Sequence, residues 1–145
     1  MNRRTLLGLT AGSGLIASAG CLNRVRGSST DTEFYLVESE VSADAPPEVT
    51  VEDGIVTVTG TVTYGSSSCG TIDLAHDEYE ASQHRLDLLV VAADKPTSVS
   101  GCTDDLRTEG YRVERPVGDD LRRIAATEHH VFGETYSTTV DLTDY

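Results

Sequence analysis

Apolar and polar residues alternate with a period of two along much of the chain beyond residue 33. The clearest run covers residues 55–64, in which Val56, Val58 and Val62 share one face and four threonines share the other. Because successive side chains of a strand point to opposite faces, the run predicts a strand with one buried and one solvated face. Gly60 stands among the buried positions, which predicts the close approach of a bulky neighbour or of another backbone.

A second run, residues 86–93, is almost continuously apolar. This pattern fits a central strand covered on both faces, and a buried helical segment gives the same pattern. The short length of the run favours the strand. Residues 77–83 contain no β-branched side chain and predict a helical turn between two strands.

Turn residues separate these runs at intervals near ten residues. Asp53-Gly54, between residues 49–51 and Ile55, predicts a hairpin. Seven or so strands in about 110 residues predict an all-β fold, an immunoglobulin-like antiparallel β-sandwich. The signature tryptophan of immunoglobulin domains is absent, so the architecture is predicted and not membership of that superfamily. The further predicted strands are residues 34–41, 71–76, 109–115, 123–131 and 136–142.

The first 21 residues have the three parts of an export signal. Arg3 and Arg4 give a basic start, residues 6–20 are mildly apolar, and small residues precede Cys21. A membrane-spanning helix needs about 20 predominantly apolar residues, and this stretch is shorter and interrupted by glycines. Residues 1–20 are therefore predicted to be a signal peptide.

The arginine pair resembles the twin-arginine export signal, in which Ser or Thr precedes the pair and Phe-Leu follows a spacer. Arg3, Arg4 and Leu7 match this pattern, whereas Asn2 and Leu6 depart from it. Twin-arginine export is the prediction, and the general secretory route is the alternative.

Residues 18–21, Ser-Ala-Gly-Cys, resemble a lipobox, in which a peptidase cuts before a cysteine whose thiol then carries a lipid. The usual leucine three residues before the cysteine is missing, and plain cleavage near an Ala-x-Ala-like site is the alternative. The resemblance implies that Cys21 anchors the protein at the extracellular face of the cell membrane. Residues 21–33 are then a flexible tether and residues 34–145 the folded domain.

The chain carries 24 acidic and 11 basic residues, a formal charge of −13, and Lys95 is its one lysine. Loss of Arg3 and Arg4 with the leader takes the charge from −13 to −15. Nucleic acid is therefore not a predicted partner. Salt of about 1 M shrinks the screening length to roughly 3 Å and removes most self-repulsion, which favours a halophilic protein. An acidic protein of ordinary salt is the alternative.

With Cys21 assigned to the lipid, Cys69 and Cys102 form an even pair on the oxidising side of the membrane. A disulfide between them is the prediction, and reactive or metal-binding thiols are the alternative. Both lie among Ser, Gly and Thr residues, so the bridge is expected to join two loops at one end of the sandwich.

The four histidines are His76, His84, His129 and His130. Blue copper sites use two His, one Cys and commonly an axial Met, and the only methionine is Met1, inside the leader. No cofactor is therefore predicted. His129 and His130 are neighbours on a predicted strand, so they are expected to point to opposite faces, with one of them exposed.

Carboxylates cluster at three places, and none of the clusters has the EF-hand spacing. In so acidic a chain such clusters are expected on the solvated surface, so no specific metal site is predicted, and weak binding of a divalent ion stays open. The clusters are Asp73, Asp77, Glu78 and Glu80; Asp104 and Asp105; and Asp119 and Asp120.

Motifs of the common enzyme classes are absent: there is no nucleophile elbow, H-E-x-x-H, glycine-rich phosphate loop or C-x-x-C. Residues 66–68, three serines, indicate a turn and not an elbow. The chain is therefore predicted not to be an enzyme, and no catalytic residue is assigned.

The arginine pair, the cysteine box, the acidic lysine-poor domain and the Cys69/Cys102 pair together resemble the twin-arginine lipoproteins of haloarchaea. The resemblance implies a location and a small β domain, and no activity. The leading hypothesis is a non-enzymatic surface module that binds or supports another envelope component. The alternative, motivated by the carboxylate clusters and by His129 and His130, is a small-solute or cation-binding accessory protein of a transporter. An envelope hydrolase has no supporting motif.

Overall fold

The computed structural model describes residues 31–96 and 101–142. The predicted signal peptide with Arg3 and Arg4, the predicted lipidation site Cys21 and most of the predicted tether lie outside the described residues.

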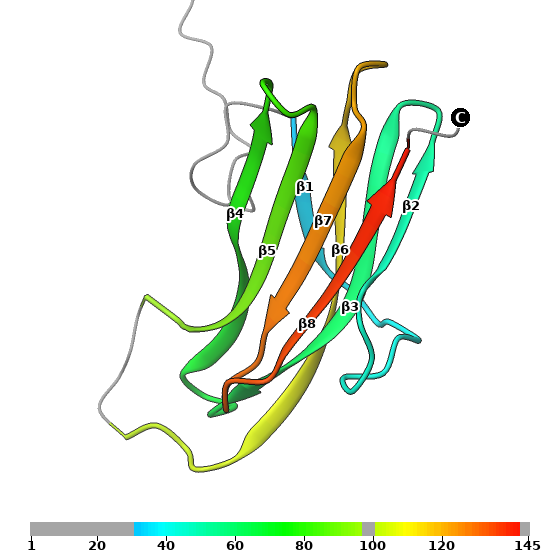
Figure 1. Ribbon diagram of the computed structural model, residues 1–145. Coiled ribbons are helices and arrows are strands. Elements are labelled where there is room, and N and C mark those ends of the chain that lie inside the picture. Colours follow the sequence, from blue (N-terminus) through cyan, green and yellow to red (C-terminus); the bar gives the residue numbers. More distant parts are fainter. Residues whose placement is uncertain (1–30, 97–100, 143–145) are drawn as a thin grey trace, which may run out of the picture.

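The described residues form eight strands in two four-stranded sheets, which confirms the predicted all-β sandwich (Figure 1). Within these ranges no helix is long and apolar enough to cross a membrane. The first sheet has the order β1-β6-β3-β2 and the second the order β4-β5-β7-β8. The strands are β1 (Glu33–Leu36), β2 (Glu48–Glu52), β3 (Ile55–Gly65), β4 (Gly70–Glu80), β5 (Arg85–Asp94), β6 (Leu106–Pro116), β7 (Arg123–His129) and β8 (Thr135–Asp141).

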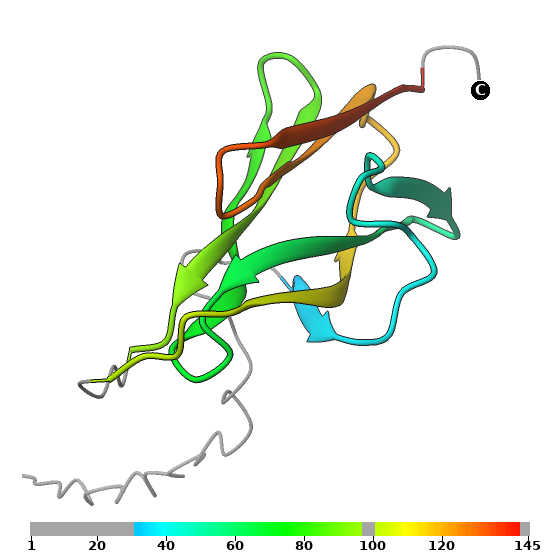
Figure 2. The same ribbon diagram turned by 90° about the horizontal axis from the view of Figure 1, so that it is seen from below.

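The core lies between the two sheets, which form two separate layers when the molecule is seen from below (Figure 2). The period-two pattern of β3 is confirmed, because Val56, Val58 and Val62 are buried and the threonines between them are only half-buried. The apolar run of β5 is a central strand, paired with β4 on one side and with β7 on the other. Local alternation therefore selects the residues that the layers enclose.

The immunoglobulin-like part of the fold prediction is not confirmed. Immunoglobulin constant domains place their strands in the orders ABED and CFG. Here β6 lies between β1 and β3, and β5 and β7 run parallel to each other. The hairpin strand β2 also raises the number of strands to eight.

The helical turn predicted for residues 77–83 is wrong. Residues 77–80 continue β4, paired with residues 85–88 of β5, and the chain turns after Glu80. The ladder shifts register between Leu74 and His76, so the strand carries a bulge. Pairing with β5 overrides the absence of β-branched residues, because strand propensity reflects the tertiary surroundings of a segment.

The hairpin at Asp53-Gly54 is confirmed, with φ of 51° and 74° at the two residues. Positive φ at both central residues is the geometry of tight hairpin turns, which Asp-Gly sequences favour. The predicted disulfide is confirmed as well, with 5.5 Å between the Cα atoms of Cys69 and Cys102. It joins the loop before β4 to the loop before β6 and so links the two sheets.

The sandwich has two distinct ends, because β3 and β6 pair over eleven residues along its length. At the entry end, Ile55 pairs with Pro116, and the chain enters β1 beside Glu114. At the disulfide end, Gly65 pairs with Leu106, next to the disulfide and the turn between β7 and β8. Eleven strand residues span roughly 35 Å, so features at opposite ends do not touch.

Candidate functional site

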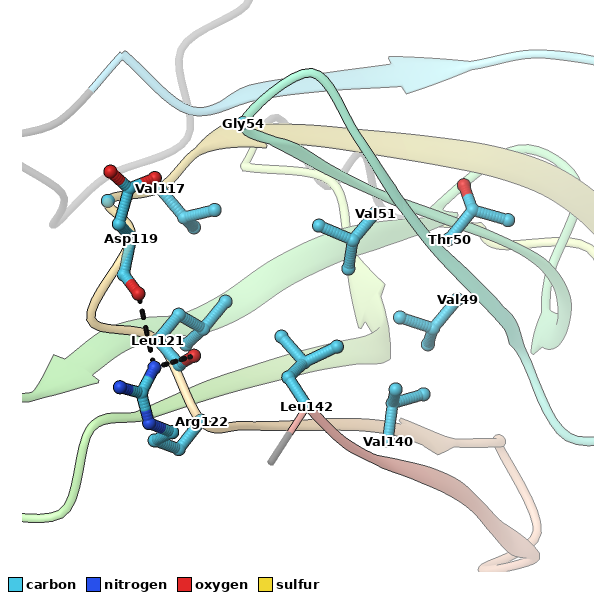
Figure 3. A pocket seen from close by; sticks show the side chains of 11 residues that line it. Val49, Thr50, Val51, Gly54, Val117, Asp119, Leu121, Arg122, Val140 and Leu142 are labelled. Atoms are coloured by element: carbon cyan, nitrogen blue, oxygen red, sulfur yellow. Dashed lines mark hydrogen bonds between the residues drawn. The ribbon is translucent and has the colours of Figure 1, made fainter. Parts of the chain in front are cut away.

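A groove of about 500 Å³, with a lining that is part polar and part apolar, opens at the entry end between β2 and β8, the edge strands of the two sheets (Figure 3). Its volume lies in the range of about 300–1,000 Å³ that is usual for small-molecule sites. Its apolar lining consists of Val49 and Val51 of β2, Val117 and Leu121 of the loop between β6 and β7, Val140 of β8, and Leu142.

The groove exists because the two sheets do not close over each other along this side. Val49 and Val140 are half-buried, whereas Val56 and Ile124 on the neighbouring strands are fully buried. Away from the groove the two edges are linked, since the Thr138 hydroxyl donates to the backbone carbonyl oxygen of Pro47 at 2.5 Å. The inward alternation of both edge strands continues past this link and leaves apolar side chains open to a ligand.

The rim of the groove carries one positive and one negative side chain, Arg122 and Asp119. An Arg122 Nη1 donates to the backbone carbonyl oxygens of Asp119 at 3.1 Å and of Leu121 at 3.2 Å (Figure 3). The guanidinium is therefore held at the mouth and keeps further N–H donors for a polar group. The site thus combines aliphatic side chains with a rim that carries both signs of charge.

A buried polar network joins the two sheets between the middle of the sandwich and its disulfide end. Glu128 of β7 is 0% exposed, and its Oε1 accepts a hydrogen bond of 2.7 Å from the Tyr111 hydroxyl of β6. Its Oε2 lies 3.3 Å from Nε2 of His130. The other ring nitrogen of His130, Nδ1, accepts from the backbone N–H of Thr63 in β3 at 3.1 Å. The network therefore ties β7 to both central strands of the opposite sheet.

These contacts fix the proton on His130. Because Nδ1 accepts from Thr63, a neutral imidazole carries its hydrogen on Nε2 and donates it to Glu128. Burial raises the pKa of Glu128, against the opposing effect of its bonds to Tyr111 and His130. Burial and the adjacent carboxylate likewise raise the pKa of Tyr111. These groups are hydrogen-bonded to one another across the two sheets. The arrangement therefore fits a structural link between the sheets and does not fit a nucleophile paired with its base.

Gly60 makes room for this network. A Cβ atom at that position would lie 2.0 Å from Oε1 of Glu128 and 2.7 Å from the Tyr111 hydroxyl. The close approach that the sequence predicts at Gly60 is thus confirmed, and the neighbour is a carboxylate from the opposite sheet.

A second buried ionic contact lies at the entry end. Arg115 Nε of β6 and Asp77 Oδ1 of β4 are 3.2 Å apart, and the two side chains are 7% and 5% exposed. An Arg115 Nη1 also donates to the Thr32 hydroxyl at 3.3 Å. Arg115 thus contacts the segment that leads into β1, and it lies two residues before the groove residue Val117.

The candidate metal residues do not converge. His129 is exposed and His130 is buried, as their adjacent positions on a strand predict. His76 lies beside Glu78, and His84 lies beside Asp120. In residues 31–96 and 101–142, no three His, Cys, Asp or Glu side chains are grouped so that they could hold a metal ion.

The carboxylates of each predicted cluster also do not converge on one point. Along β4, Asp73 and Glu78 are exposed, whereas Asp77 faces inward to Arg115. Asp104 is exposed, whereas Asp105 accepts from the Ser67 backbone N–H at 2.9 Å and from the Thr103 hydroxyl at 2.6 Å.

The serine turn, residues 66–68, is organised by Asp105. The Ser67 backbone hydrogen bond, followed by the one from Thr103, holds the pKa of Asp105 well below its usual range. The Thr103 hydroxyl in turn lies 3.0 Å from the Ser66 hydroxyl oxygen. The cluster braces the two loops that the disulfide joins, which agrees with the turn that the sequence indicates.

Sequence reasoning missed two features of the surface. The first is the groove, whose lining comes from three separate stretches of chain. The second is a set of exposed apolar side chains at the disulfide end: Phe132 is 71% exposed and Leu106 is 51% exposed, and Val131 covers Gly65. A shallow depression of about 290 Å³, lined by Val131 and the end of β5, adjoins them. The one sequence signal was Val131-Phe132 directly before Gly133.

Comparison with known proteins identifies no relative: no protein-family model, no curated protein and no solved structure matches the chain.

Proposed function

We propose that the protein is a lipid-anchored, non-enzymatic surface module that binds another component of the cell envelope through its disulfide end. The observation that carries the proposal is the position of Val131 and Phe132. Both residues are exposed and belong to the turn between β7 and β8, and this turn lies at the end of the sandwich opposite the start of β1 (Figure 1).

The turn that carries these exposed side chains is held by hydrogen bonds to the opposite sheet. The backbone N–H of Val131 donates to the Thr63 carbonyl oxygen at 3.1 Å, and the preceding residue, His130, belongs to the buried network. A preorganised apolar surface loses little conformational entropy when it binds, and buried aromatic side chains carry much of the energy of interfaces.

The chemistry of the domain fits binding better than catalysis. The hydroxyl, imidazole and carboxylate groups described above are engaged in contacts that hold sheets or loops together. The twin-arginine and lipobox resemblances support display at the extracellular face, with the membrane reached through Cys21.

Site-specific photo-crosslinking in native membranes tests the proposal. A photoreactive phenylalanine at position 132 is expected to give a discrete adduct, and the same residue at Glu52, which is exposed and pairs with Ile55 at the opposite end, serves as the matched control. A Phe132→Ser variant is expected to lose the partner on co-purification while keeping the unfolding midpoint of the unmodified protein. Identical adducts from both positions, or none from position 132, would reject this surface as the binding site.

A further inference from the structure

We infer that residues 106–109 of β6 form an open strand edge, and that the partner of the disulfide end binds there by adding an extended segment to the sheet. The inference deepens the proposed function and rests on it for the existence of a partner. It names the chemical class of that partner, a polypeptide in extended conformation that pairs through its backbone.

The open edge exists because β1 covers only one half of β6 (Figure 1). β6 pairs with β3 along its full length, Leu106–Pro116, whereas β1 pairs only with residues 111–114. The last contact on the β1 side is the hydrogen bond of 3.0 Å from the Val37 backbone N–H to the Gly110 carbonyl oxygen. Among the described residues, nothing pairs with this side of β6 beyond Gly110, toward the disulfide end.

Gly110 explains why the chain leaves the edge of the sheet at this point. A Cβ atom at Gly110 would lie 2.3 Å from the carbonyl oxygen of Val37 and 2.7 Å from the backbone nitrogen of Ser39. The chain therefore crosses the outer face of the first sheet directly over this glycine. Further along the crossing, the Thr61 hydroxyl donates to the carbonyl oxygen of Val41 at 2.6 Å. The part of β6 that follows the crossing toward the disulfide end is left uncovered.

The backbone of the open segment presents the hydrogen-bonding pattern of a strand. Alternate residues of β6 point their N–H and C=O groups toward β1, and because Gly110 is one of them, Thr108 and Leu106 are the next. These groups repeat about every 7 Å, the spacing of alternate residues in an extended chain. An extended segment in line with β1 satisfies them, as in the recognition of peptides by open sheet edges.

The side chains beside the open edge favour an apolar partner segment. Leu106 is 51% exposed and pairs with Gly65 of β3, which has no side chain. Val131 lies beyond that glycine, because a Cβ atom at Gly65 would be 3.3 Å from a Val131 methyl carbon. An apolar row therefore leads from the edge to the turn that carries Phe132, so one partner can contact both.

The edge strand β4 of the second sheet lacks this receptive character. It carries a bulge between Leu74 and His76, and the charged side chains of Asp73 and Glu78 are exposed along it. Bulges and charges are the features by which natural sheets prevent the addition of another strand. Residues 106–109 have no bulge in their pairing with β3.

A second copy of the chain fits the open edge poorly. Self-pairing that uses both outward residues sets Leu106 opposite Thr108 of the second copy. That register also places Arg107 directly opposite the same arginine of the second copy, and like charges at directly opposite positions are destabilising. The occupant is therefore a segment of a different polypeptide.

A peptide probe tests the edge on the full-length protein. The probe is a short peptide of alternating valine and threonine with a lysine at each end. The control peptide has proline at two adjacent central positions, which removes an N–H from each of its edges. The probe is expected to slow amide hydrogen exchange at Leu106 and Thr108 about tenfold, and to leave Thr139 on the edge strand β8 unchanged. The control peptide is expected to slow none of them.

Two variants at one position separate the backbone of the edge from its side chain. Thr108→Pro removes the outward N–H and keeps the ladder with β3, because Thr108 directs its backbone groups away from β3. It is expected to abolish probe binding and to lower the adduct yield from position 132 in native membranes about tenfold, whereas Thr108→Ala changes neither. Equal unfolding midpoints of the two variants show that both are folded.

The outcomes keep the edge and the proposed function apart. Equal exchange at Thr108 with the two peptides overturns the edge as a site of strand addition. Equal adduct yields from position 132 in Thr108→Pro and Thr108→Ala overturn strand pairing as the mode of binding and leave the proposed function standing. Without any adduct from position 132 the proposed function fails, and slowed exchange with the probe alone then keeps the edge as a strand-binding site. A dimer in solution that Thr108→Pro dissociates assigns the edge to a second copy and overturns the inferred partner.

Discussion

Around Glu128 the two sheets are joined by buried polar contacts, and between the edge strands β2 and β8 they stand apart over aliphatic side chains. Glu128, Tyr111 and His130 are buried between the sheets in the first region, and their hydrogen bonds require one geometry. Val49 and Val140 line the second region, where contacts are not directional and space of about 500 Å³ remains. The difference shows how one sandwich can fix the approach of its two sheets in one region and leave space between them in another.

Loss of the disulfide is expected to have the largest effect. Cys102→Ser opens a covalent loop of 33 residues, for which chain entropy predicts a loss of about 3–4 kcal/mol in the free energy of unfolding. Urea unfolding at constant salt measures this loss in the free energy of unfolding. The unmodified protein is measured before and after reduction for comparison. A reduced protein as stable as the oxidised one would show that the hydroxyl cluster around Asp105 braces these loops without the bond.

Breaking the polar strut is expected to come next. Glu128→Ala leaves the Tyr111 hydroxyl and the His130 Nε2–H buried without their acceptor, at a cost of about 2–4 kcal/mol in the free energy of unfolding. Glu134→Ala, at an exposed position near the same turn, is the control and is expected to change little. Amide hydrogen exchange at Thr63 and Val131 should accelerate in Glu128→Ala alone. Unchanged exchange would contradict a role of the network in holding the turn.

The groove is expected to tolerate substitution better. Val140→Ala removes two methyl groups from a half-buried side chain beside existing space, so about 1 kcal/mol or less is expected. Ile124→Ala on the neighbouring strand, which is fully buried, should cost about 2–4 kcal/mol. Equal losses from the two substitutions in chemical denaturation would mean that the sheets close over Val140 in solution.

The smallest effect is a dependence on pH. Because the pKa of Glu128 is raised in the folded protein, its protonated form favours folding. The contribution is complete below the unfolded-state pKa of about 4.5 and is lost as pH rises through the folded-state pKa. The stability of the unmodified protein relative to Glu128→Gln should therefore fall as pH rises above about 4.5. Glu134→Gln, at an exposed position, is the reference variant. If the difference in free energy of unfolding between the unmodified protein and Glu128→Gln did not change with pH, burial would not be raising the pKa of Glu128.

Most strands could be predicted from the sequence, and their pairing could not. The alternation of β3, the apolar run of β5 and the Asp-Gly turn are local patterns, and each corresponds to an observed element. Residues 77–80 became strand because β5 pairs with them, which no local pattern states. β5 and β7 pair in parallel although all of β6 separates them along the chain. No local sequence pattern therefore distinguishes this strand order from the immunoglobulin-like order.

The candidate site divides along the same line. Cys69 and Cys102 were found by counting cysteines, and the opposite orientations of His129 and His130 follow from the geometry of a strand. The partners of His130 could not be found in this way, because Glu128, Tyr111 and Thr63 come together only when the sheets stack.

By itself the sequence determined the all-β class, most of the strands, the hairpin and the cysteine pair. Alternation and turn residues are patterns within a few neighbouring residues, and the cysteine pair follows from the number of cysteines. The tertiary structure alone decided that the sheets enclose a buried carboxylate in one region and leave a groove between β2 and β8 in another. Both features depend on how far two sheets approach each other, and that distance is set by all the side chains between them.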